Sequence, residues 1–241
     1  MDSQPGPSTS KAPFLFGGLC FVAGVFLGRY IYREDQTRRL MPGKQHAWYS
    51  KSDAPGWLQE LFDPKSGNKR LHYREWEDQQ FRQKKGWHGQ DLIHNQNSKA
   101  VCIKAYFWNE QEQTLTGIVE FGENAESHRG LAHGGAMTSA MDDVCGHACF
   151  MIGDGPWVGA TVQVNCALKK PVKIGHTLKV TGKVESRTGR KVFIKGKLMN
   201  EHGEVYVEMD GISIAGVNLS QENDEIANRK WDRTGQGTIV G

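Results

Sequence analysis

The alternation of apolar and polar residues in the second half of the chain predicts a sheet that is interrupted by one long helix. Residues 101–108 and 114–121 have the period-two pattern of strands, and a polar turn separates them. Between 135 and 152, apolar residues recur at helical spacing instead. Four more strands are predicted after this helix, at 157–168, 176–187, 191–199 and 204–215. Because the helix and the strands must bury their apolar faces together, this order predicts an α+β fold with an antiparallel sheet wrapped around the helix.

The N-terminal part has a different texture. Residues 1–12 are polar and rich in Ser and Pro, which predicts disorder. Residues 13–28 carry no charge, and two tyrosines extend the apolar run to residue 32, past Arg29. A membrane-spanning helix needs about 20 such residues. We therefore expect an N-terminal transmembrane helix at 13–32.

Three alternatives to this anchor remain open: a cleaved signal peptide, a transit peptide and a buried core helix. The charge distribution disfavours a signal peptide, because only Lys11 precedes the run and the basic residues follow it. A transit peptide should be Arg-rich and amphipathic, and this segment is neither. The following basic residues are Arg29, Arg33, Arg38, Arg39 and Lys44. This bias predicts that the rest of the chain faces the mitochondrial matrix or the cytosol, and the short anchor favours a mitochondrial membrane over the endoplasmic reticulum.

Between anchor and sheet, residues 33–99 are charged and dotted with tryptophans, and we expect a helical arm that packs on the domain or on a partner. Within it, 54–62 has the pattern of a short amphipathic helix that ends at 63–67, and 73–84 that of an exposed helix. Residues 217–241 are polar and predict a flexible tail. The domain itself spans 100–216.

Composition narrows the function classes. The formal net charge of +3 comes without any basic stretch interleaved with aromatics, so we expect no nucleic-acid partner. The five cysteines are odd in number and form no Cys-x-x-Cys pair, which argues against a disulfide framework and a zinc site. Cys145 and Cys149 share one helix face and are expected in the core. We expect no metal and no redox cofactor.

A family resemblance follows from three motifs in order. Residues 130–136 read Gly-Leu-Ala-His-Gly-Gly-Ala, and Asp142 follows the second glycine of the pair by seven positions. Residues 165–171 end a strand in Lys-Lys-Pro, and 188–191 read Thr-Gly-Arg-Lys. Together these motifs, over residues 100–216, resemble the PaaI-type hotdog-fold acyl-CoA thioesterases, and most of all the mitochondrial thioesterase superfamily members four and five. The resemblance implies hydrolysis of medium- or long-chain acyl-CoA to the free acid and CoA by a homodimer or a dimer of dimers.

The glycine pair suits thioester chemistry. Without side chains, the backbone N–H groups of Gly134 and Gly135 can approach a thioester oxygen closely at the positive end of the predicted helix. The same glycines could merely allow a tight turn into that helix. His133 could contact the substrate or make a structural hydrogen bond from the loop.

Two adjacent carboxylates compete for the catalytic role. The resemblance assigns Asp142 as general base or nucleophile, while Asp143 is the competing candidate and could pair with His147 four residues later. The five-residue step from Asp142 to His147 is also similar to that of hotdog enoyl-CoA hydratases, although their surrounding motif is absent. Thr161 lies where the family orients the attacking water, or it is only a β-branched strand residue.

Three basic residues complete the predicted site. Three residues, Lys169, Arg190 and Lys191, match family positions that contact the CoA nucleotide. The alternative is that their side chains are ordinary solvent-exposed surface residues. Ala167 stands where the related enzymes have a binding Asn. This departure, with the anchor and the arm, favours an alternative function: a weak or inactive hotdog module that serves as an anchored accessory subunit or regulator of a membrane complex.

Overall fold

The computed structural model describes residues 49–72, 76, 87, 91–95, 98–153, 158–218, 229–231 and 237–239. The predicted anchor at 13–32 lies outside these residues, as do 1–12 and nearly all of the predicted helix at 73–84. Within the described part of the chain, no helix combines the length and the apolar character that crossing a membrane requires.

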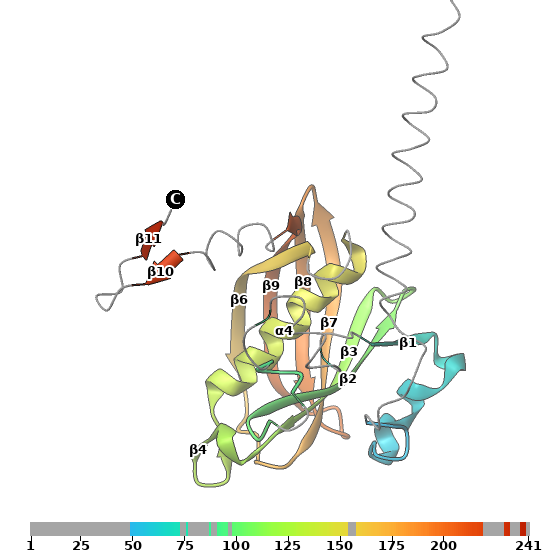
Figure 1. Cartoon of the computed structure of the whole chain (residues 1–241). Helices are drawn as coiled ribbons and strands as arrows, with labels where there is room; N and C mark the ends of the chain where they lie inside the picture. The colour runs from blue at the N-terminus through green and yellow to red at the C-terminus, as the bar shows by residue number, and fades with distance from the viewer. Residues whose placement is uncertain are drawn as a thin grey trace, which may run out of the picture. The chain divides into compact units, whose positions relative to one another are not determined.

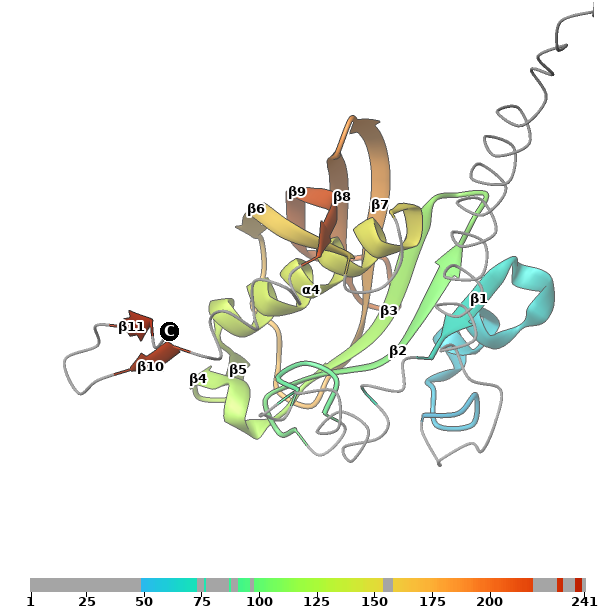
Figure 2. The ribbon, with the colours of Figure 1, turned by 45° about the horizontal axis from the view of Figure 1, so that its top comes forward.

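An antiparallel sheet of seven strands holds the domain together, in the order β1-β2-β3-β7-β8-β9-β6. A single long helix, α4 (Gly134–Ile152), lies across one face of this curved sheet (Figures 1 and 2). The predicted arrangement of a sheet wrapped around one helix is therefore confirmed. The strands are β1 (Asn68–Leu71), β2 (Val101–Asn109), β3 (Thr114–Phe121), β6 (Val158–Leu168), β7 (Thr177–Thr188), β8 (Lys191–Met199) and β9 (Val205–Asn218).

Strand β8 illustrates how the sequence gives the sheet one buried face and one solvent-exposed face. Its residues alternate strictly, with Val192, Ile194 and Leu198 buried and lysines exposed between them. Successive side chains of a strand point to opposite faces, so the apolar set meets α4. The buried face of α4 offers mainly small or flexible residues: Ala140, Met141, Val144, Cys145, Ala148 and Cys149.

Glycine lets the helix lie close to the sheet. A Cβ at Gly211 on β9 would lie 2.5 Å from Cys145 Sγ on α4, so no larger residue fits there without a shift. Cys145 and Cys149 are fully buried, which confirms their expected place in the core.

The first part of the N-terminal arm packs on the other face of the sheet, against β2 and β3. The expected short amphipathic helix at 54–62 is present as a 3-10 helix, η1 (Gly56–Phe62), which buries Leu58 and Leu61. The element is short and ends before Pro64, which disfavours a continuing α-helix. Leu58 and Leu61 pack against Phe107 and Ile118, on the side of β2 and β3 that faces away from α4. The expected packing of this part of the arm on the domain is confirmed.

Other segments differ from the expectations in detail. A second 3-10 helix, η2 (Pro64–Ser66), leads into β1, which the sequence did not predict. The expected loop at 122–132 contains η3 (Glu123–Ala125), β4 (Glu126–His128) and β5 (Leu131–Ala132). Within 217–241, two short strands pair antiparallel: β10 (Arg229–Trp231) and β11 (Gly237–Ile239).

Candidate active site

The start of α4 is fixed by His133 and the glycine pair. His133 is the N-cap residue, and its Nδ1 accepts the N–H of Gly135 at 2.8 Å. A backbone N–H can only donate, so Nδ1 must carry a lone pair in this state. Gly134 lies against strand β6, where a Cβ would come within 2.7 Å of Leu168 Cδ1. The two glycines thus allow both a cap and a close approach between helix start and strand.

This cap bears on the predicted polarisation of a thioester. The first N–H groups of a helix have no partner one turn earlier within it. That of Gly135 is occupied by the His133 imidazole, which is exposed and can rotate away. Gly135 can therefore turn its N–H to a substrate oxygen only when His133 moves, and its catalytic role stays a prediction. The expected structural hydrogen bond of His133 is present.

Asp142 and Thr161 meet at a recess between α4 and β6. The recess has a volume of about 320 Å³ and is lined by Thr138, Ser139, Asp142, Thr161, Val162, Gln163 and Val164. The Asp142 carboxylate reaches solvent through the open side. The protein atoms around it nevertheless disfavour its charged form and raise its pKa, whereas the hydroxyl of Thr161 lowers it; the negative charge of Asp143 raises it further. A carboxylate with a raised pKa next to a hydroxyl is a suitable proton acceptor.

Asp143 points away from the recess into a set of hydrogen-bond donors. Tyr106 Oη lies 2.7 Å from its Oδ2, His94 Nε2 3.2 Å from its Oδ1, and His147 Nδ1 3.2 Å from its Oδ2. Burial alone would raise the pKa of Asp143, but the charges of His94 and His147 and the hydrogen bonds from both outweigh it and hold the pKa well below its usual range. Asp143 is therefore a fixed charge rather than a group that exchanges protons near neutral pH.

His147 contacts Asp143 and not Asp142, so the structure does not form the Asp142–His147 pair that the hydratase-like spacing would suggest. His147 is 5% exposed, and its Nδ1 lies 2.9 Å from the Asp143 carbonyl oxygen and 3.2 Å from the Asp143 carboxylate. The expected pairing of His147 with Asp143 is confirmed. In the described structure His147 faces the inner cluster, whereas Asp142 faces the recess.

His94 is the residue that the sequence did not reveal. It lies in the segment 91–95, and its side chain is 3% exposed under Trp76, whose ring stacks on it at 3.7 Å between centroids. Its partner Asp143 is 49 positions away along the chain, and no spacing rule links the two. Only the packing of the arm onto β2 and α4 brings them together.

A metal ion was tested against this cluster. Among the described residues, one group of three possible ligands occurs, and the ligand atoms of His94, Asp143 and His147 lie within 4.8 Å of one another. Zinc ligands lie about 2.0–2.2 Å from the metal, so atoms that share an ion are at most roughly 4.4 Å apart. In addition, the 2.9 Å contact from His147 Nδ1 to a carbonyl oxygen requires a proton on that nitrogen, since the carbonyl can only accept. With that proton on Nδ1, His147 could offer only Nε2 to an ion, and the expected absence of a metal stays a prediction.

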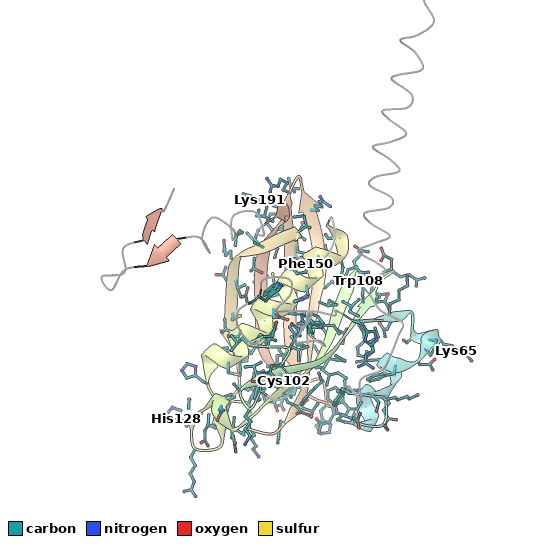
Figure 3. All side chains as sticks on the ribbon, viewed as in Figure 1. Lys65, Cys102, Trp108, His128, Phe150 and Lys191 are labelled. Carbon is teal, nitrogen blue, oxygen red and sulfur yellow. The ribbon has the colours of Figure 1, made fainter. Side chains whose placement is uncertain are left out.

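The predicted CoA-binding cations do not gather at the helix start. Lys169 forms an ion pair with Glu208 at 3.1 Å, and the Arg190 guanidinium donates to the carbonyls of Ala215 and Gly216 at 3.0 and 3.1 Å. Arg190 and Lys191 adjoin the β7–β8 turn, and Figure 3 shows Lys191 at the tip of that hairpin. Nearby Arg187 donates to Ile152 at the far end of α4.

This placement separates the predicted groups. A helix of 19 residues is about 28 Å long. Arg190 and Lys191 therefore lie a helix length from Gly134 within one chain. Ala167 is exposed on β6. Of the predicted site residues, the structure brings together His133 with the two glycines, and Asp142 with Thr161.

Comparison with known proteins agrees with this arrangement. Residues 129–207 match the family model described as the thioesterase superfamily. The acyl-coenzyme A thioesterase THEM4 of Rattus norvegicus is 27% identical over 90 residues, which cover 37% of each chain. That of Mus musculus is 24% identical over 111 residues, or 46% of each chain. The matched region thus spans less than half the length of these relatives.

Solved structures show weaker likeness. The E. coli PaaI protein has a TM-score of 0.40 and 17% identity, with 43% of this chain and 73% of that chain covered. The family match is more direct, because it contains the helix start, Asp142 and Thr161. The motif-based resemblance is thus confirmed: residues 129–207 match the thioesterase superfamily, within a domain that has the sheet and helix of the hotdog fold.

Proposed function

We propose that this protein is an acyl-CoA thioesterase that hydrolyses medium- or long-chain fatty acyl-CoA to the free acid and CoA. One observation carries the proposal: Asp142 and Thr161 line the same open recess, inside the segment that matches the thioesterase superfamily.

The chemistry follows from this geometry. Asp142 takes a proton from a water molecule that Thr161 helps to orient, and the water oxygen bonds to the thioester carbon. Gly135 lies seven residues before Asp142, which is about 10 Å along α4. The backbone N–H groups that stabilise the negative charge on the carbonyl oxygen are therefore proposed to come from the start of α4 in a second copy of the chain. The C–S bond then breaks, and the thiolate of CoA takes up the proton from Asp142. Asp142 acts here as a general base; direct attack by its carboxylate on the thioester is the alternative.

The size of the recess bears on how the substrate is held. At about 320 Å³ it is at the small end of ligand pockets, which run from roughly 300 to 1,000 Å³. It can enclose the thioester and a part of the acyl chain, while the nucleotide lies outside it. Lys169, Arg190 and Lys191 are the cations proposed to bind the CoA phosphates.

A second copy of the chain is proposed to complete the site. Strand β6 is the outermost strand of the sheet and forms one wall of the recess. It exposes Val162 by 59% and Leu168 by 48%, which is unusual for large apolar side chains next to an active site. Pairing of two β6 edges would cover both residues and bring in the partner's cations. A homodimer is the smallest such assembly, and a dimer of dimers would preserve it.

Residues 13–32 are proposed to anchor the enzyme in a membrane, with the domain on the matrix or cytosolic side and a mitochondrial membrane favoured. Protease protection on fractionated organelles checks this topology. A domain that is digested only after the inner mitochondrial membrane is opened supports the matrix side, and recovery in the lumen of the endoplasmic reticulum contradicts the proposal.

A non-enzymatic role is the second candidate. Arg190 is engaged with backbone carbonyls, Gly135 with His133, and Ala167 replaces a binding Asn. These features favour an anchored accessory subunit or regulator of a membrane complex. Purification in mild detergent separates the candidates: stable association with other membrane proteins supports this role, and a free homo-oligomer counts against it.

The decisive test is hydrolysis of a panel of acyl-CoA esters by the full chain in mild detergent. We expect activity on some chain lengths, and a loss of roughly 10²–10⁴-fold in Asp142→Asn, the usual contribution of a general base. Asp210→Asn, an exposed carboxylate on β9, is the matched control and should keep full activity. No activity on any ester, or an Asp142→Asn variant as active as the wild type, would refute the function.

A further inference from the structure

A buried polar cluster lies on the side of α4 that turns away from the recess. Its centre is the Asp143 carboxylate, which Tyr106, His94 and His147 contact from three elements. Trp76 stacks on His94 at 3.7 Å, and its ring lies 5.0 Å from that of His147. The mechanism proposed above uses none of these side chains. A buried carboxylate costs several kcal/mol unless it is bonded, so a cluster that satisfies one beside a catalytic residue calls for an explanation.

The cluster joins the arm to the thioesterase domain. Asp91 Oδ1 accepts the N–H groups of Ile93 and His94 at 2.9 and 2.7 Å, which forms a tight turn and presents the His94 imidazole. This turn lies outside the segment 129–207 that matches the family. The arm therefore supplies a group that contacts the neighbour of Asp142 in sequence.

We propose that Asp143 is a positioning residue for Asp142: the arm, through His94, holds Asp143 as a fixed negative charge beside Asp142 and anchors the third turn of α4. The kinetic part of this inference rests on the proposed thioesterase function, whereas its electrostatic part does not.

Electrostatics supports the link between the two carboxylates. They occupy successive positions of one helix, so they cannot move apart, and a like charge at this range disfavours ionisation. The titratable groups coupled to Asp142 in the described structure are Asp143 and His147, with Cys145 and Cys166. The walls of the recess add only neutral side chains, among them Thr161 and Gln163. Asp143 raises the pKa of Asp142, and His147 lowers it.

Two substitutions should therefore move Asp142 in opposite directions. Asp143→Asn removes the like charge and should lower the titration midpoint of Asp142 by roughly 0.5–1 pH unit. His147→Gln removes the opposing cation and should raise the midpoint. If the cluster had only a structural role, the two substitutions would not shift the Asp142 midpoint in opposite directions.

The midpoint is measured by carboxyl ¹³C NMR on the full chain labelled at aspartate, with the Asp142 signal assigned by its loss in Asp142→Asn. The acidic limb of the pH profile of kcat/KM should shift with it. Tyr106→Phe is the control, because it removes one bond to Asp143 but leaves the charge. It should lower stability and leave the limb in place. If Asp143→Asn does not fold, His147→Gln alone decides the question.

The outcomes separate the two proposals. An inactive wild type refutes the enzyme while NMR still tests the positioning. An Asp142 midpoint that is the same in wild type, Asp143→Asn and His147→Gln overturns the inference. So does one equivalent of transition metal per purified chain that is lost in His94→Gln, because the ion would cancel the charge of Asp143.

Discussion

Gly146 places the backbone of α4 directly against the hydroxyl of Thr161, one turn after Asp142. A Cβ at this position would lie 3.3 Å from Thr161 Oγ1, which is tighter than the usual contact of about 3.5–4.0 Å. Thr161 is only partly buried, so its hydroxyl can rotate away. The substitution Gly146→Ala should therefore displace the Thr161 hydroxyl, which lowers the pKa of Asp142, without breaking the fold.

Gly146→Ala should have opposite effects on stability and on activity. Replacing glycine by alanine inside a helix stabilises it by roughly 0.5–1 kcal/mol. A hydrogen bond to a charged group contributes about 1.5–3 kcal/mol, and the open recess argues for the lower end. If the Thr161 hydroxyl makes such a bond in the transition state, a loss of about 1.4 kcal/mol reduces the rate tenfold. We expect Gly146→Ala to have an unchanged or raised Tm and about a tenfold lower kcat/KM.

The assay combines calorimetry with the release of free CoA thiol from an acyl-CoA ester. Thr161→Val removes the hydroxyl directly, and the double variant closes a mutant cycle. Because both changes act on the same hydroxyl, Gly146→Ala should add almost nothing in the Thr161→Val background. Full activity of Gly146→Ala, or losses that multiply in the double variant, would refute the reasoning.

Three further predictions concern stability. Tyr106→Phe removes the 2.7 Å bond to the Asp143 carboxylate and should lower the free energy of unfolding by roughly 1.5–3 kcal/mol in urea at pH 7; a loss under about 0.5 kcal/mol would contradict it. Burial alone would lower the pKa of His147, but the Asp143 carboxylate raises it above the unfolded value. This contribution is complete below about pH 6.5 and disappears as pH rises through the folded pKa, so urea titrations should show a decline in wild type that His147→Gln lacks. Leu58→Ala, at a side chain 1% exposed, should cost about 2–4 kcal/mol and speed proteolysis of the arm, unless the arm is dispensable to the domain.

The elements with a strong hydrophobic period could be predicted from the sequence. Residues 191–199 were predicted as a strand with the bounds that β8 has, and α4 begins one residue earlier than expected. Strand β1 could not be predicted, since its four residues Asn-Lys-Arg-Leu carry no alternation. Its backbone pairs with β2, and this tertiary pairing rather than local preference makes it a strand.

The residues of the candidate site also fall into those that local sequence predicts and those that only tertiary contacts bring into place. The cap at His133 and the position of Asp142 on α4 are local, so a short motif predicted them. Thr161 could be placed by analogy, because one strand follows the helix directly. His94 could not, because its partner is 49 positions away. Nor does the sequence indicate that the Arg190 guanidinium bonds to the backbone of its own chain.

Asp142 and Asp143 are adjacent residues of the same type, and only the structure shows that their surroundings differ. Successive helix residues are about 100° apart around the axis, since one turn takes 3.6 residues. This rotation turns Asp142 toward β6 and solvent, and Asp143 toward β2 and three donors. The first carboxylate has a raised pKa and the second a depressed one, so the second holds its negative charge more firmly than the first. A base and a fixed charge beside it therefore arise from one dipeptide, and a helix rotation that brought Asp143 to the recess would bring Val144, which accepts no hydrogen bond through its side chain, to the three donors.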